Sequence, residues 1–150
     1  MTTFKPMVFR IGNELYGIDI MYVNAIEKDQ TVVRVPNTSS CIKGIINLRG
    51  DVVPVYDLRC KFNLPPSPNP TKIIVANLPD MKLAIEVDDV KEINDLTLDQ
   101  VKELPRIAKN NDIKYFTSVA NINGELVLLI DIRELLTQEE QEKAKQLMEE

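Results

Sequence analysis

Residues 42–59 read IKGIINLRGDVVPVYDLR. Two apolar runs, 42–48 and 52–58, flank Arg49, Gly50 and Asp51, and short glycine-containing breaks between apolar runs are typical of β-hairpin turns. The stretch therefore predicts two antiparallel strands joined by a tight turn, with Arg49 at the tip.

The same pattern occurs again in residues 119–133, VANINGELVLLIDIR. Both copies keep Asn, Gly, an acidic residue, an apolar run and Asp-x-Arg. A second pair of matching segments, 18–26 (IDIMYVNAI) and 85–93 (IEVDDVKEI), shares an apolar–acidic–apolar triplet followed by Val-x-x-Ile. Two copies are too few for a solenoid, so we expect two similar small β units packed against each other.

Positions that both hairpins share are expected to serve the hairpin itself. We expect Gly50 and Gly124 to adopt a positive φ in the turn, and Asp57 and Asp131 to bind backbone amides where the second strand ends. Arg49 is not shared, because its counterpart is Asn123. A hairpin-tip arginine is ordinarily just solvated, but this asymmetry favours a role for Arg49 in binding a partner.

Composition limits the possible functions. The chain has 150 residues, 44% of them hydrophobic, and a formal charge of −5 from 18 basic and 23 acidic residues. A single domain with a real core is expected, and nucleic-acid binding is disfavoured because there is no basic excess. No apolar run reaches the ~18 residues of a membrane helix, and the first residues lack a secretory signal, so we expect a cytoplasmic protein with no direct membrane insertion.

Alternating apolar residues at 16–20 and 82–87 predict half-buried strands and a mainly β fold. Four prolines within 65–70 mark a stiff connector, which suggests two β subdomains, roughly 1–64 and 71–150, with strand exchange between them possible. Thr137 and Glu140 have the spacing of a capping box, so a C-terminal helix is expected to start there.

The residues needed for common enzyme chemistry are missing. The chain contains no histidine, and no phosphate-binding glycine motif is found, so we expect no catalytic residue, no metal site and no cofactor. Cys41 and Cys60 lack Cys-x-x-Cys spacing. We expect them to be free thiols that behave as small apolar residues; a disulfide is the alternative that the expected compartment disfavours. A binding module is favoured over an enzyme.

The ordered motifs YGIDI (16–20), IKG (42–44) and NLRGxxxPVxDLR (47–59) resemble those of the CheW-type chemotaxis coupling proteins, over nearly the whole chain. The resemblance implies two packed SH3-like five-stranded β-barrels with a C-terminal helix. It further implies a scaffold adaptor, located at membrane-associated chemoreceptor arrays, that couples the cytoplasmic tips of methyl-accepting chemoreceptors to the regulatory domain of the histidine kinase CheA.

The resemblance also implies where the partners bind. Val23, Ile26 and Arg49 correspond to receptor-binding positions of the family at a groove between the barrels, although Val23 and Ile26 are also compatible with ordinary core packing. Many members carry an acidic residue where this chain has Ala25, so either Glu27 substitutes for it or the contact is more apolar.

Kinase contacts are expected near Val35 and Ile42 in the first barrel and Ile93 in the second, because these SH3-like units meet end to end through strand edges. The competing function is that of a small-ligand-binding β-barrel protein that uses the inter-barrel groove.

Overall fold

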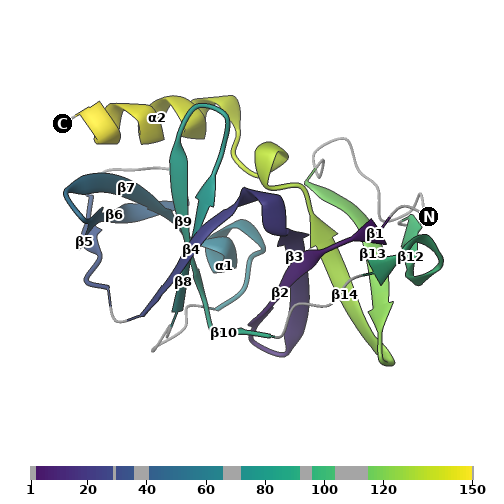
Figure 1. Cartoon of the computed structure of the whole chain (residues 1–150). Coiled ribbons are helices and arrows are strands. Elements are labelled where there is room, and N and C mark those ends of the chain that lie inside the picture. The colour runs from purple at the N-terminus through teal and green to yellow at the C-terminus, as the bar shows by residue number, and fades with distance from the viewer. Residues whose placement is uncertain are drawn as a thin grey trace. The chain divides into compact units, whose positions relative to one another are not determined.

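The computed structural model describes residues 3–28, 30–35, 41–65, 72–91, 96–103 and 115–149 (Figure 1). The described chain is mainly β, with two six-stranded sheets, one two-stranded sheet and the C-terminal helix α2 (Gln138–Glu149). It divides into two compact units. Unit 1 comprises residues 1–22 and 89–135, and unit 2 comprises 23–88 and 136–150. No helix within these described ranges is both long and apolar enough to cross a membrane.

The larger sheet of unit 1 is antiparallel except where β3 and β14 run parallel. Its strands, in spatial order, are β10 (Asp89–Val90), β2 (Pro6–Ile11), β3 (Glu14–Asp19), β14 (Glu125–Ile130), β13 (Phe116–Ile122) and β12 (Val101–Glu103). The other elements are β1 (Thr3–Phe4), which pairs with β11 (Leu96–Thr97), and the 3₁₀ turns η1 (Ile20–Tyr22), η2 (Leu98–Gln100) and η3 (Ile132–Glu134). Buried residues from several of these strands form one cluster, made of Val8, Leu96, Ala120, Val127 and Leu129.

The sheet of unit 2 has the same plan, with a single parallel pair between β7 and β9. Its strands are, in spatial order, β4 (Val23–Lys28), β8 (Lys72–Asn77), β9 (Lys82–Val87), β7 (Asp51–Tyr56), β6 (Ile42–Leu48) and β5 (Val33–Arg34). The short helix α1 (Leu58–Lys61) follows β7, and α2 belongs to this unit. The core cluster consists of Ile46, Val53, Val55, Ile73, Val75 and Ala84.

The internal repeats seen in the sequence are exchanged between the two units. The hairpin β6–β7 comes from the first copy, but its parallel neighbour β9 comes from the second; conversely, the second-copy hairpin β13–β14 pairs with first-copy β3. The register is the same in both, because the pairs Val55–Ala84 and Leu129–Gly17 occupy equivalent repeat positions. The units are therefore not the consecutive halves 1–64 and 71–150.

Each of the two larger described sheets has six strands where five were expected. The edge strands β5 and β10 are only two residues long, and two residues are too few to show the period-two alternation by which a strand is recognised in a sequence. The mainly β class and the C-terminal helix agree with the expectation.

Helix α2 starts with the predicted capping box, which is confirmed. The Glu140 N–H donates to Thr137 Oγ1 at 3.1 Å, and the Thr137 N–H donates to Glu140 Oε1 at 3.0 Å. These two bonds satisfy amides that a helix start leaves without partners.

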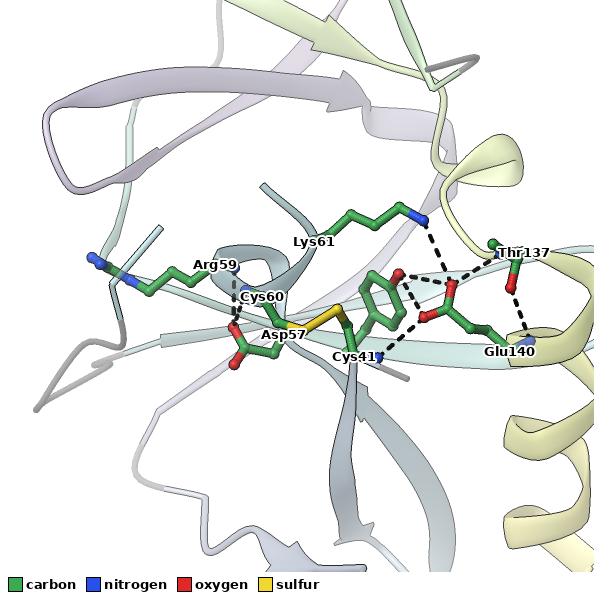
Figure 2. The surroundings of a disulfide bond; sticks show 8 residues. Cys41, Asp57, Arg59, Cys60, Lys61, Thr137 and Glu140 are labelled. Atoms are coloured by element: carbon green, nitrogen blue, oxygen red, sulfur yellow. Dashed lines mark hydrogen bonds and ion pairs between the residues drawn. A yellow bond between two sulfur atoms is a disulfide. The ribbon is translucent and has the colours of Figure 1, made fainter. Parts of the chain in front are cut away.

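The prediction of two free thiols is wrong, because Cys41 and Cys60 form a disulfide (Figure 2). The prediction rested on the expected compartment and ignored the hairpin. Cys41 directly precedes β6 and Cys60 follows β7, and the pairing of Ile42 with Tyr56 brings these ends together. The two Cα atoms lie 5.5 Å apart, within the range that a disulfide requires.

Candidate functional site

The two hairpin tips have the same backbone conformation. Arg49 and Gly50 have φ values of 51° and 92°, and Asn123 and Gly124 have 53° and 87°. Two successive residues with positive φ form the turn that suits the twist of a two-residue β-hairpin. The preceding Asn reinforces each turn, since Asn47 Oδ1 accepts a bond from the Gly50 N–H at 3.0 Å and Asn121 Oδ1 accepts one from the Gly124 N–H at 2.9 Å.

Arg49 occupies a turn position whose backbone conformation suits asparagine better than arginine. A positive φ is unfavourable for most residues, whereas Asn tolerates it and occupies the position in the second hairpin. The Arg49 side chain is 81% exposed, and its Nη2 lies 3.5 Å from Glu27 Oε1. An ion pair this exposed contributes little to stability. The fold therefore makes little use of the guanidinium, which remains accessible to a partner.

Strand β4 carries the other three predicted receptor residues, and they do not all face the same way. Val23 and Glu27 are half-buried, whereas Ile26 is 42% exposed. Ile26 and Glu27 pair with consecutive residues of β8 without a bulge, so their side chains lie on opposite faces. The structure thus brings Glu27 to Arg49 but places Ile26 on the other face of β4.

On strand β4, Ala25 packs against the core cluster of unit 2. A longer acidic side chain at this position would have to displace that packing or turn out of it. The exposure of Ile26 separates it from the core, so the packing alternative does not account for this residue.

The predicted kinase residues are in different environments. Val35 is half-buried after β5, and its N–H donates to Lys43 O at 3.5 Å. Ile42 is 2% exposed and is a core residue, so its side chain is not displayed to a partner. Ile93 lies outside the described residues. The sequence did not point to Val33, which is 59% exposed on the edge strand β5. Its apolar side chain was the only feature that could have marked it as a contact residue.

The aspartates that follow each hairpin cap the next turn. Asp57 Oδ1 accepts bonds from the N–H groups of Arg59 and Cys60, and Asp131 Oδ1 accepts one from Arg133 N–H. The arginines two residues on differ between the copies. Arg59 pairs with Asp88 at 2.7 Å, whereas Arg133 pairs with the nearby Asp131 at 3.0 Å and is 53% exposed.

Unit 1 also contains an open pocket of about 340 Å³ that the sequence did not predict. The Arg133 guanidinium lies 5.5 Å from the centre of the Tyr22 ring in its wall. The lining mixes polar and apolar side chains from Asp19, Tyr22, Val101, Thr117, Ser118, Leu129, Ile130, Asp131, Ile132 and Arg133.

The described residues form a mainly β protein of two similar sheet units, with an exposed arginine at one hairpin tip. Residues 5–140 match the model of the CheW-like domain. The chain belongs to the CheW-like family, and its function is that of a chemotaxis coupling adaptor.

Similar individual proteins support membership of the same family. The chain is 38% identical over 137 residues to the chemotaxis protein CheW of Klebsiella aerogenes, covering 89% of this chain and 82% of that protein. It is 32% identical to the chemotaxis protein CheW of Bacillus subtilis, with 93% and 91% covered. Among solved structures, the scaffolding protein TtCheW from Thermoanaerobacter tengcongensis has a TM-score of 0.79 at 28% identity, with 89% of this chain and 92% of that chain covered.

Proposed function

We propose that the chain is a non-catalytic adaptor in the cytoplasm that joins the regulatory domain of the histidine kinase CheA to the cytoplasmic tips of methyl-accepting chemoreceptors at membrane-associated arrays. Membership of the CheW-like family supports this assignment. None of the relatives named above is described as a ligand-binding protein, so the comparisons do not favour the small-ligand alternative.

The exposed Arg49 side chain is the observation that carries the receptor part of the proposal. Its guanidinium forms only a weak surface pair with Glu27, although arginine is a poor residue for the backbone conformation found there. A planar guanidinium recognises a carboxylate through two parallel hydrogen bonds. We assign Arg49 to a receptor carboxylate, Glu27 to orienting Arg49, and Val23 and Ile26 to apolar contact.

The kinase contact is proposed at the β5 edge of unit 2. Strand β5 is the last strand in the described order of this sheet, and an edge strand offers backbone groups to a strand of a partner. Val33 and Val35 supply apolar side chains there, while Ile42 supports the edge from the core. A second contact near Ile93 stays a sequence prediction.

We assign each unit to an SH3-like barrel, in which the six-stranded sheet curls so that its two edge strands approach one another. The likeness to the scaffolding protein TtCheW supports this assignment. Residues 1–150 would then form one CheW-like domain of two such subdomains that share segments.

The test is assembly of the three-part complex from purified kinase regulatory domain, a receptor-tip fragment and this protein. Arg49→Asn converts the tip to the turn found in the second hairpin, so the fold should be unchanged or slightly more stable. Loss of a charge-assisted contact at an interface is expected to weaken receptor binding by ~2 kcal/mol or more, with kinase binding unchanged. Lys102→Ala, which removes an exposed cation from β12, is the matched control. Equal receptor affinity of wild type and Arg49→Asn would contradict the proposal.

A further inference from the structure

The Cys41–Cys60 disulfide joins two segments that both contact one buried carboxylate (Figure 2). Glu140, in the first turn of α2, is 6% exposed. The Cys41 N–H donates to Glu140 Oε2 at 3.2 Å, and the Nζ of Lys61, the residue after Cys60, lies 3.6 Å from Oε1. The two sides of the disulfide therefore each supply a partner for the same carboxylate.

Two further groups complete the environment of this carboxylate. The Tyr56 hydroxyl lies 2.9 and 3.0 Å from the two Glu140 oxygens, and the Thr137 N–H donates to Oε1. A buried carboxylate depends on having all of its donors in place. Any change that lets the Cys41 amide or Lys61 move weakens the attachment of the first turn of α2.

We propose that the Cys41–Cys60 disulfide is a redox-sensitive fastening that controls how firmly the first turn of α2 docks on unit 2. In the oxidised protein, the S–S bond holds the start of β6 against α1 and keeps the Cys41 amide and Lys61 at Glu140. In the reduced protein, the backbone bond from Asp57 N–H to Cys41 O, at 2.9 Å, still joins these segments, so the sheet persists while the α2 attachment loosens.

The reductant is a dithiol. Cys60 is exposed, so a thiolate of the dithiol attacks its sulfur and the Cys41 thiolate leaves and takes up a proton. The second thiol of the reductant then attacks the mixed disulfide and releases Cys60, which is protonated in turn. The net change is two electrons and two protons transferred to the protein, with the reductant becoming a disulfide. Disulfides in reducing compartments are commonly of this transient, redox-sensing kind.

Hydrogen exchange of the full-length protein, before and after treatment with dithiothreitol, tests the proposal. Reduction is expected to raise the exchange rate of amides in the first turn of α2, such as Gln141, several-fold, while β2 and β3 of unit 1 serve as the reference and stay unchanged. The double variant Cys41→Ser, Cys60→Ser should exchange like the reduced wild type and should not respond to the dithiol.

Glu140→Gln distinguishes coupling through the carboxylate from a general loss of stability. In this variant, exchange at the first turn of α2 should already be fast in the oxidised state, and reduction should add little. Equal α2 exchange in the two redox states of the wild type, with the disulfide verified by mass, would overturn the proposal. So would full alkylation of both cysteines in protein purified without reductant.

Discussion

The residues with positive φ at the two hairpin tips show which features the turn requires and which it does not. Both tips use two successive positive φ values and an Asn side chain that braces the second residue. The glycine is common to both, whereas Arg49 replaces a residue that suits the conformation better. The fold tolerates Arg49 at this position but does not favour it, which supports the proposal that Arg49 contacts a partner.

Gly50 is expected to resist substitution more than Arg49 does. Its φ is 92°, and a Cβ built there meets no atom within 4 Å, so the cost of a side chain is conformational and not steric. Gly50→Val should lower stability by about 1–2 kcal/mol, measured by thermal unfolding. Gly50→Asn, which tolerates positive φ, is the matched control and should cost clearly less. The interpretation fails if Gly50→Val is as stable as the parent.

Among the elements, the edge strand β5 depends on a close backbone approach. A Cβ on Gly44 of β6 would clash with the Val33 carbonyl oxygen, so even alanine there must push β5 away. The contact is with backbone, which yields less easily than the end of a side chain. Strand β5, which is proposed to contact the kinase, can therefore pair closely with β6 only because residue 44 has no side chain.

Gly44→Ala is expected to destabilise the protein by about 1–3 kcal/mol and to weaken binding of the kinase regulatory domain, while receptor-tip affinity is kept. Gly17→Ala is the control, since a Cβ built at Gly17 would lie closest to the Leu129 Cδ2 atom, at 2.9 Å, and this atom belongs to a flexible side chain. Thermal unfolding and two separate titrations measure these effects. Unchanged kinase affinity in a folded Gly44→Ala protein would remove β5 from the kinase contact.

Helix α2 is attached through a carboxylate whose pKa is shifted. Burial alone would raise the pKa of Glu140, but hydrogen bonds from the Thr137 amide, the Tyr56 hydroxyl and the Cys41 amide, together with the Lys61 charge, outweigh it and lower the pKa below its ordinary value of 4.5. A lowered pKa in the folded state means that the ionised group stabilises the protein at pH above 4.5. This contribution is lost as the pH falls through the lower, folded-state value.

Glu140→Gln should therefore destabilise the protein at pH 7 by roughly 1–3 kcal/mol, because donors lose their ionised acceptor. The difference from wild type should shrink as the pH falls below 4.5. Urea unfolding followed by circular dichroism between pH 7 and pH 3 measures it, with the exposed Glu142→Gln on the same helix as control. A difference that stays constant down to pH 3 would show that Glu140 acts through packing and not through charge.

At the scale of the whole molecule, the adaptor function requires two surfaces that are occupied together. Linking works by raising the local concentration of one partner beside the other, so it depends on geometry and needs no catalytic group. The proposed receptor contact at the β6–β7 tip and the proposed kinase contact at the β5 edge involve different residues, Arg49 in one case and Val33 in the other.

Excess adaptor is expected to inhibit, because kinase and receptor then saturate with separate copies. Titrating this protein against fixed amounts of kinase and receptor-tip fragment should give a rise and then a fall in both phosphorylation and complex size. A rise to a plateau without decline would indicate additional adaptor–adaptor contacts, and mutually exclusive binding of the two partners would contradict the bridging role.

Local patterns predicted the hairpins, the repeats and the capping box, because each is specified by neighbouring residues. They did not predict which strand pairs in parallel with which hairpin, since β3 and β9 have equivalent sequences and either partner would satisfy the pattern. The same limit applies to single positions. The burial of Ile42, the opposite faces of Ile26 and Glu27, and the pairing of Cys41 with Cys60 all depend on how strands meet in space.

The exchange of repeats also dictates an order of events during synthesis. All strands of the unit 2 sheet lie between Val23 and Val87, so this sheet can form as soon as that stretch has left the ribosome. Strand β3, in contrast, must wait for β14, since Tyr16 pairs with Leu128. Such distant pairing is slow to find. The N-terminal hairpin β2–β3 therefore spends most of translation without its final neighbour, and a nascent chain released before β14 leaves that apolar strand open to chaperones and to aggregation.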